Sequence, residues 1–360
     1  NCILPALNPT ICWKLFNLNN LNWRQSAGNL LSLNLIEILR DYTLEFICCK
    51  ILPFSRVKDT LETESNSFKF NNFIKISENI SNLNFSCYLT GLIEGNGTII
   101  VPKTDKTIKG HINYPSVQIT FNLKDLPLAL MVQKNLKTGS LFKKKGVSAY
   151  VLIVNNLEGL LLITSLINGN MRTTKAQELW ALIDWLNLKY KDLYFIKKPI
   201  NTGFLKYNAW FSGFIDAESH FLIRSTIASK HTKIECKFEL SKIKKDYRGK
   251  DNLEFLKIIA KFLDTSVKSV KTNKPSAEYK VKTTNLTGNI NLENYLNSYP
   301  LFSSKYLDYK DWVKVLNYFK SGQFKFNNYI EDIVLIKSKM NNKRTEFNWD
   351  HLNKFYSLDK

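Results

Sequence analysis

The sequence predicts an α+β protein built from two pseudo-symmetric half-domains, each with the element order αββαββα. The first observation behind this prediction is a short motif that occurs twice, at Leu89–Gly97 and at Phe211–Ser219, and aligns without a gap. Each copy leads from an apolar helical stretch through acidic and small residues into a β-prone stretch, at 98–101 and 221–223. The second observation is that the patterns that follow also recur, so we expect two similar half-domains that face each other.

Alternating polarity predicts the strands of both halves. In the first half, Ser116–Asn122 places Val117, Ile119 and Phe121 on one face and polar residues on the other. In the second half, Lys233–Leu240 alternates in the same way, which is typical of a half-buried antiparallel strand. The residues expected to face inward there are Ile234, Cys236, Phe238 and Leu240, and those expected to face outward are Lys233, Glu235, Lys237 and Glu239. Further strands are expected at 149–154 and 278–284.

Capping signals predict the helices that follow these strands. Asp125 with Pro127 starts a helix that ends near Gly139. Asp251, with Glu254 three residues later in a capping-box arrangement, starts its counterpart. The last helices of the two repeats are expected to begin near 174–175 and 304–305.

The motif itself predicts how its two helices meet. Gly91 and Gly95 in the first copy, and Gly213 and Ala217 in the second, are four residues apart and share one helix face. Small residues on that face allow two helix backbones to approach closely, so we expect the motif helices to pack on each other. The last polar position of each copy then lies at a helix C-terminus, where carbonyl groups lack partners and the macrodipole is negative. A carboxylate at this place makes a cation site, and two such sites would suit two-metal phosphodiester cleavage.

From about residue 80 to 340 the chain resembles the LAGLIDADG family, the homing endonucleases and maturases encoded within organellar introns, in its single-chain form with two motifs. The resemblance implies two sheets that form a saddle over the DNA major groove, and Mg²⁺ as the cofactor of any nuclease activity. It implies metal-binding positions at the motif ends, namely Asn96, Glu218, Gly95 and Ala217. It also implies catalytic roles for Lys175 and Lys305, which match the family's basic residue near the scissile phosphate, where a cation polarises water or stabilises phosphorane charge. The alternative for both lysines is a solvated helix start.

One motif position departs from the family pattern. Active members have a metal-binding carboxylate at both motif ends, whereas this chain has Asn96 in the first copy and Glu218 in the second. An amide offers a carbonyl oxygen but no charge, and a hard divalent cation depends strongly on anionic ligands. The sequence therefore predicts a degenerate nuclease centre with little or no activity.

Charge indicates a polyanionic partner. The chain has 51 Lys and Arg against 31 Asp and Glu, a net charge of +20, which favours binding to nucleic acid phosphates. Polar and basic residues on the outward strand faces, together with the basic stretch 242–250, are the candidates for contact with bases and phosphates. The candidate nucleic-acid-binding residues are Gln118, Thr120, Asn122, Lys233, Lys237, Lys242, Lys244, Lys245, Arg248, Lys250, Lys280 and Lys282.

Composition also limits the class of protein. The richest apolar run, Leu157–Ile167, is too short to span a bilayer and contains Glu158, so no membrane insertion is expected. The six cysteines have no C-x-x-C spacing, which predicts neither a zinc site nor a disulfide framework. Heavy use of Asn, Lys, Ile, Leu and Phe indicates an AT-rich, organellar gene, so we expect a mitochondrial matrix protein. A chain that opens at Asn1 is expected to be a processed or truncated product.

Three functions are compatible with the sequence. The favoured one is a maturase that binds group I intron RNA and assists its splicing, with additional splicing proteins as possible partners. The second is a Mg²⁺-dependent, site-specific DNA homing endonuclease that cuts both strands or nicks one. The third is a structural RNA-binding role. We expect a monomer with an internal pseudo-dimer, divided into an N-terminal helical extension and linker at 1–75, half-domains at 76–190 and 207–345, a connecting linker at 191–206 and a C-terminal tail at 346–360.

Overall fold

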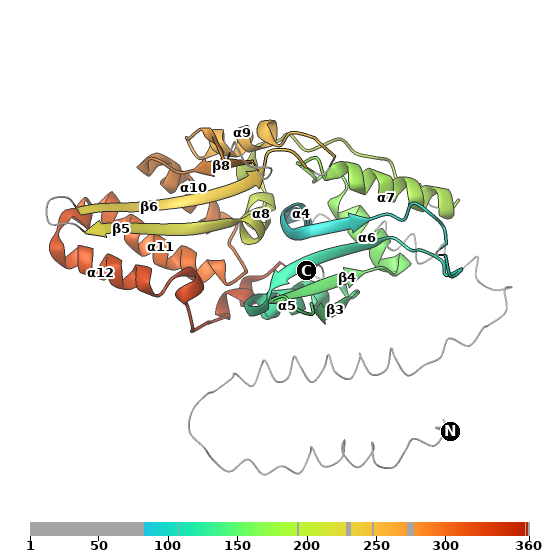
Figure 1. The fold of residues 1–360 in the computed structure, drawn as a ribbon, viewed down its shortest axis with the longest axis horizontal. Helices are drawn as coiled ribbons and strands as arrows, with labels where there is room; N and C mark the ends of the chain where they lie inside the picture. Colours follow the sequence, from blue (N-terminus) through green and yellow to red (C-terminus); the bar gives the residue numbers. More distant parts are fainter. Residues whose placement is uncertain are drawn as a thin grey trace, which may run out of the picture. The chain divides into compact units, whose positions relative to one another are not determined.

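The computed structural model describes residues 83–358, except 107, 193, 228–231, 247, 272–276 and 357. The predicted N-terminal extension lies outside this part of the chain. Within it, no helix is long and apolar enough to cross a membrane. The two repeats appear as two copies of one supersecondary unit (Figure 1), and the predicted α+β class is confirmed.

Each half contains the seven predicted elements in the predicted order. The first half consists of α4 (Leu83–Asn96), β1 (Gly97–Ile100), β2 (Ser116–Asn122), the 3-10 turn η3 (Leu123–Asp125), α5 (Leu126–Leu136), β3 (Ser140–Lys143), β4 (Ala149–Val154), α6 (Leu157–Ile167) and α7 (Ala176–Lys189). The second half consists of α8 (Trp210–Glu218), β5 (Ser219–Ile227), β6 (Thr232–Ile243), α9 (Leu253–Phe262), β7 (Val267–Val270), β8 (Glu278–Lys282), α10 (Leu286–Ser298), α11 (Lys305–Lys320) and α12 (Asn327–Ser338).

The structure adds one helix to the first predicted half and two to the second. Where one helix was predicted after the last strand, α6 and α7 follow it in the first half, and α10, α11 and α12 follow it in the second. The helices α7 and α11 begin at the predicted places. The helix α6 is the apolar run noted in the sequence, and eight of its eleven residues are buried. Its Leu160, Ile163 and Ile167 belong to the core of the first half.

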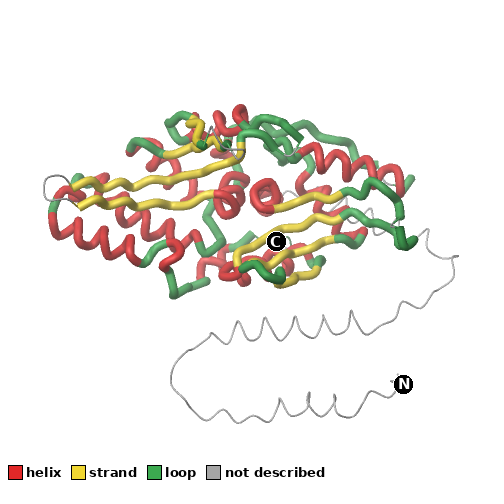
Figure 2. The backbone as a smooth tube through the Cα atoms, in the orientation of Figure 1, coloured by secondary structure: helices red, strands yellow, loops and turns green. Residues whose placement is uncertain are grey.

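The two sheets have the same topology and equivalent register. Their strand orders are β1-β2-β4-β3 and β5-β6-β8-β7, and every neighbouring pair is antiparallel. The first residue after each motif helix is paired in the same way, Gly97 with Ile119 and Ser219 with Leu240. Figure 2 shows one sheet on each side of the central pair of helices.

The motif helices α4 and α8 pack against each other between the two sheets (Figure 1), as predicted. A Cβ atom on Gly91 would lie 2.1 Å from the Trp210 carbonyl oxygen, and one on Gly213 would lie 2.0 Å from the Tyr88 carbonyl oxygen. Because both distances are to backbone atoms, neither position has space for a side chain. Every residue of α4 from Phe85 to Gly95 is buried, so this helix has no polar face to reveal it in the sequence.

The capping box predicted for α9 is not formed. Asn252 rather than Asp251 is the N-cap residue, and Asp251 Oδ1 accepts a hydrogen bond from the Leu253 N–H at 2.7 Å. Glu254 pairs instead with Lys257, one helical turn later. In the first half, Asp125 makes no cap of its own helix, because its Oδ1 accepts the Ser304 N–H of the second half at 2.7 Å.

The predicted C-terminal tail crosses from the second half to the first. Leu352 is part of the first-half core, and Phe355 makes edge contacts with the rings of Phe85 and Tyr88 at centroid distances of 6.0 and 5.7 Å. Further along, the Leu358 N–H donates to Asn135 Oδ1 at 3.2 Å. Residues 349–356 and Leu358 therefore form a further link between the two halves, at a distance in sequence from the motif helices.

Candidate nuclease centre and nucleic-acid surface

Two buried carboxylates cross between the motif helices and hold the centre together. Glu94 of α4 accepts hydrogen bonds from the Thr173 N–H at 2.6 Å, the Arg172 N–H at 2.9 Å and the Trp210 Nε1–H of the other half at 2.6 Å. Asp216 of α8 makes the reciprocal contact, because it accepts a hydrogen bond from the Tyr88 hydroxyl of the first half at 2.7 Å. Burial raises the pKa of both carboxyl groups, while these donors oppose the shift. Each half thus contributes one acceptor and one donor to the other.

Asn96 is the last residue of α4 and is exposed. Its Nδ2–H donates a hydrogen bond to the carbonyl oxygen of Ala217, on the opposite motif helix, at 3.0 Å. Ala217 is one of the positions predicted to bind metal. The neutral amide therefore satisfies this carbonyl with a proton, where a carboxylate would repel it.

Glu218, at the end of α8, forms an ion pair with Lys242. The distance between Glu218 Oε1 and Lys242 Nζ is 2.5 Å, and both side chains are largely buried. The Lys242 ammonium also lies 5.5 Å from the centre of the Phe214 ring. Lys242, which was predicted as a nucleic-acid contact in the basic stretch 242–250, lies in strand β6, and its ammonium group is paired with Glu218.

Lys175 fixes the C-terminal end of α4. Its Nζ donates to the carbonyl oxygens of Ile93 at 3.0 Å, Glu94 at 3.0 Å and Gly97 at 2.7 Å. Burial, followed by the nearby Lys242 ammonium, lowers the pKa of Lys175 to about 8. Lys175 therefore titrates near physiological pH.

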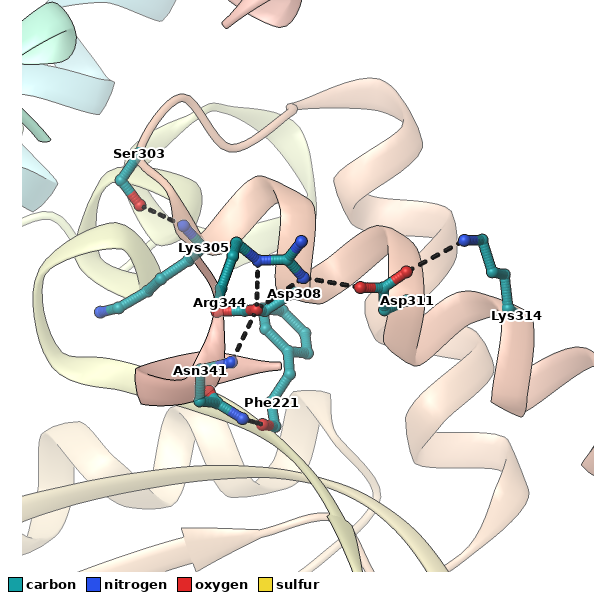
Figure 3. A network of polar contacts seen from close by, with 8 residues as sticks. All are labelled: Phe221, Ser303, Lys305, Asp308, Asp311, Lys314, Asn341 and Arg344. Atoms are coloured by element: carbon teal, nitrogen blue, oxygen red, sulfur yellow. Dashed lines mark hydrogen bonds and ion pairs between the residues drawn. The ribbon is translucent and has the colours of Figure 1, made fainter. Parts of the chain in front are cut away.

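Lys305 does the same for the second motif helix. Its Nζ donates to the carbonyl oxygens of Ile215 at 3.1 Å and Asp216 at 2.7 Å, and burial lowers its pKa. The Lys305 N–H is held by Ser303 Oγ, and one turn later Asp308 accepts from Arg344 (Figure 3). Neither Lys175 nor Lys305 is the solvated helix start of the alternative interpretation, because both ammonium groups are turned onto motif carbonyls.

A cavity of about 260 Å³ opens beside Asn96 and Lys305. Its polar lining comes from both halves, and sequence analysis missed most of it because these residues lie far apart in the chain. The polar residues that line it are Asn96, Thr120, Asn122, Lys124, Asp125, Asp216, His220, Ser303, Ser304, Lys305, Asp308, Asn341 and Asn342. Predicted base-contacting residues Thr120 and Asn122 are thus brought next to one motif end.

Acidic neighbours balance the lysines predicted to line the second sheet. Glu235 pairs with Lys237 at 2.7 Å and with Lys233 at 3.1 Å, and the hydrogen bond from Lys237 is the main reason that the pKa of Glu235 falls to about 2. Glu239 was expected to face outward, but only 3% of its side chain is exposed. Two lysines cover it, Lys282 at 2.7 Å and Lys280 at 3.2 Å.

The remaining predicted contacts are divided between strand faces and the loop after β6. Gln118 Nε2 donates to Ser116 Oγ at 3.3 Å. In the loop, Lys244 lies over the Tyr279 ring at 5.2 Å, and Lys245 forms a β-bridge with Asp251. Arg248 and Lys250 are exposed, and Arg248 Nη1 donates to Gln177 Oε1 at 3.4 Å.

The donor set does not fit a pair of divalent cations. Among the described residues, no group of three or more His, Cys, Asp and Glu side chains has the arrangement of a metal site. At one motif end the protein offers an amide whose N–H is turned to the shared carbonyl, and at the other a carboxylate that is already paired with an ammonium group. Hard cations of this kind require anionic oxygen ligands.

Comparisons with known proteins agree with the repeat and the fold. The sequence profile of the LAGLIDADG endonuclease family matches the chain twice, at residues 89–186 and 211–316. The "Intron-encoded DNA endonuclease aI3" of Saccharomyces cerevisiae is 30% identical over 76% of this chain and 73% of its own length. The "Intron-encoded RNA maturase bI4" of the same organism is 32% identical, over 38% of this chain and 19% of its own length.

Among solved structures, the LAGLIDADG homing endonuclease I-GzeII, in complex with its DNA target, superposes with a TM-score of 0.54. That similarity covers 72% of this chain and 99% of the other at 18% identity, so it shows the fold alone. The two profile matches span more than half of the chain, and each coincides with one of the two structural repeats. On this basis the chain belongs to the LAGLIDADG endonuclease family.

Proposed function

We propose that this chain is an intron-encoded maturase that binds group I intron RNA and assists its splicing, with a degenerate nuclease centre. The observation that supports this most directly is the hydrogen bond from Asn96 to the Ala217 carbonyl. At this motif end a neutral amide stands where a metal ion needs a negative charge. The amide also occupies the Ala217 carbonyl oxygen, which would otherwise serve as a backbone ligand. The fold is kept while the chemistry of one half is weakened.

The energetic consequence is large for cleavage and small for binding. Loss of one group that stabilises transition-state charge costs about 3 kcal/mol or more, which is two or more orders of magnitude in rate. At the other motif end, a cation must displace Lys242 before it reaches Glu218. Phosphate binding needs neither carboxylate, because the net charge of +20 supplies the attraction.

The alternative is a Mg²⁺-dependent DNA endonuclease that nicks or cuts slowly. Glu218 and the two motif-capping lysines favour it, because Lys175 and Lys305 lie at the motif ends. The family resemblance implies that basic residues at these positions act near the scissile phosphate. One relative is named a DNA endonuclease and another an RNA maturase, so the names are compatible with both proposals. A mitochondrial matrix location, additional splicing proteins as partners and a purely structural RNA-binding role remain proposals that rest on the sequence.

Cleavage of an intronless target DNA separates the two main proposals. With Mg²⁺, we expect the purified protein to give no efficient double-strand cut, and any residual activity to be a nick that Glu218→Gln abolishes. Asn96→Asp should raise the rate, because it restores the missing charge. Complete linearisation by the unaltered protein at ordinary enzyme concentration would overturn the degenerate-centre proposal.

A splicing assay on the cognate precursor RNA tests the maturase proposal itself. Glu218→Gln should leave splicing assistance within about twofold, since no metal-activated water of the protein takes part. Charge reversal of Lys244, Lys245 and Lys250 should reduce it strongly, and affinity for the RNA should weaken steeply with salt because phosphate contacts release counterions. If Glu218→Gln at unchanged stability harms splicing as much as the reversal does, the passive role of the protein is refuted.

A further inference from the structure

The segment that joins the two halves forms an ordered strap along helix α7. Residues 194–203 contain no helix or strand, yet their backbone is held at several points. Asn187 exchanges two hydrogen bonds of 2.9 Å with the backbone of Phe195, and the Trp180 Nε1–H donates to the Lys198 carbonyl at 3.1 Å. Arg172 Nη1 donates to the carbonyl oxygens of Asn201 and Gly203. The strap therefore runs antiparallel to α7.

The strap runs along one flank of α7. Leu179, Leu182 and Leu186 of α7 belong to the same core as the inward residues of β2. Trp180 and Asn187, which hold the strap, lie about a quarter turn round the helix from these residues, and Trp180 also packs against this core. The strap leads to the N-terminal end of α8, whereas Glu218 of the candidate nuclease centre lies at the C-terminal end of that helix.

Aromatic side chains project from this strap into solvent. At its end, Leu205 is buried in the second-half core, while the neighbouring Phe204 and Tyr207 are 72% and 64% exposed. Their rings meet edge to face at a centroid distance of 5.9 Å. At the other end, Tyr194 is 80% exposed. The adjoining rings of Phe204 and Tyr207 form a continuous exposed apolar surface, and continuous apolar patches on a protein surface mark interaction sites.

Lysines accompany these rings. The Lys206 ammonium lies 4.9 Å from the centre of the Tyr207 ring and 6.0 Å from that of Phe204. Within the described part of the chain, neither Lys206 nor Lys198 has a carboxylate partner. Lys197 differs, because it pairs with Asp184 at 2.7 Å. Lys206 beside the exposed rings, together with the exposed Lys198 further along the strap, matches a ligand that has both π faces and negative charge.

We infer that the strap is a second nucleic-acid site that binds single-stranded RNA, with Phe204, Tyr207 and Tyr194 as stacking surfaces for bases and Lys198 and Lys206 as phosphate contacts. Base stacking on aromatic rings, combined with a basic track for the backbone, is the general chemistry of single-strand recognition. Duplex nucleic acid does not fit, because its bases are already stacked. Folded RNA offers unpaired loops whose bases are free to stack on protein. This site goes beyond the proposed function, since it requires only RNA with unpaired bases.

Binding of a fluorescent 12-nucleotide single-stranded RNA, measured by anisotropy on the full chain, tests the inference. The double variant Phe204→Ala/Tyr207→Ala should bind this RNA at least tenfold more weakly. Its affinity for a duplex DNA of equal length should change less than twofold. Phe326→Ala provides a matched control, because Phe326 is 61% exposed and follows a lysine in the second half, away from the strap.

Two further variants guard against a folding artefact. Tyr194→Ala, at the opposite end of the strap, should weaken RNA binding by itself, and Lys206→Gln should reduce the salt dependence of binding. Unchanged RNA affinity in the Phe204→Ala/Tyr207→Ala variant, an equal loss in Phe326→Ala, or tighter binding of single-stranded DNA than of RNA would each overturn the site. Failure of the unaltered protein to assist splicing would refute the maturase proposal and leave this site intact.

Discussion

The two halves of this protein are alike where they touch each other and differ where they face solvent. Glu94 and Asp216 occupy the same motif position, and each accepts a hydrogen bond from the other half. Lys175 and Lys305 likewise cap their motif helices in the same way. Two positions after the buried carboxylates, however, one half has an amide and the other a carboxylate. One motif therefore serves two separable purposes, helix packing and metal chemistry.

The largest effect is expected where the halves must be alike. Gly213→Ala places a Cβ atom about where the Tyr88 carbonyl oxygen lies, so the two helices must separate. We expect a loss of about 4 kcal/mol or more in the free energy of unfolding, comparable to the most damaging core substitutions. Urea unfolding followed by circular dichroism measures it, with Gly203→Ala as a control whose nearest neighbour is the flexible end of Asn201. A small loss would show that the helices have room to move apart.

The buried carboxylates should be nearly as sensitive. Glu94→Gln exchanges an acceptor of several hydrogen bonds for a group that also donates, so at least one N–H or O–H donor loses its partner. About 3 kcal/mol of stability is expected to be lost, and a similar amount for Asp216→Asn. Thermal or urea unfolding of both variants compares the halves directly. If one variant is neutral, the two crossing contacts are not equivalent.

The pH dependence of stability should reveal Lys175. Its pKa is about 8 in the folded protein, below the ordinary value of 10.5, so the folded state disfavours its charged form. Below pH 8 the Lys175 amine is protonated in both the folded and the unfolded state, and the cost of burying its charge is present in full. Between pH 8 and about 10 only the unfolded state keeps this proton. The free energy of unfolding of the unaltered protein should therefore rise by about 1.4 kcal/mol per pH unit relative to that of Lys175→Met.

That gain is measured by urea unfolding at pH 7, 8, 9 and 9.5. Lys175→Met should be the less stable protein at pH 7, because it leaves the carbonyl oxygens of Ile93, Glu94 and Gly97 without their donor. A difference between the two proteins that stays constant over this range would place the pKa of Lys175 near its ordinary value.

The smallest effect sharpens the contrast between the motif ends. Asn96→Asp replaces an N–H donor with a carboxylate beside the Ala217 carbonyl and at the negative end of a helix dipole. We expect a loss of about 1 kcal/mol without metal. Mg²⁺ at millimolar concentration should restore part of it by binding the folded state, and should leave the unaltered protein unchanged. Calorimetry with and without Mg²⁺ gives both numbers, and an equal Mg²⁺ response in the two proteins would contradict the account of Asn96.

The repeat allowed much of the fold to be predicted from sequence. Ser116–Asn122 appears at its predicted bounds, because its period-two pattern marks a sheet with one buried face. Ala149–Val154 also appears at its predicted bounds, as a short apolar run rich in β-prone residues. The helix α6 was seen only as an apolar run, since a helix with most of its surface buried has little amphipathic pattern. The short edge strands β3 and β7 contain four residues each, too few to show a period.

The candidate site was less predictable than the fold. The motif positions themselves locate Asn96, Glu218, Lys175 and Lys305, because spacing within a repeat is visible in sequence. Lys242 was assigned to a basic cluster because neighbouring lysines hide its different direction: the end of strand β6 turns it toward Glu218. The ion pairs of the lysines on the second sheet were also missed in the sequence. Their partners Glu235 and Glu239 come from the same or an adjacent strand, and the lysines were assigned to nucleic-acid contact instead.

The crossing of residues 349–358 has a consequence for how the chain is made. Synthesis proceeds from the N-terminus, so α4 and the first sheet leave the ribosome long before Leu352 and Phe355, which complete their core. Until then, Phe85 and Tyr88 lack part of their covering. A ribosome that stalls before residue 349 therefore releases a first half with exposed aromatic surface, a substrate for chaperones and proteases. Synthesis of the segment that contains Leu352 and Phe355 is in this sense a folding step of the half that was made first.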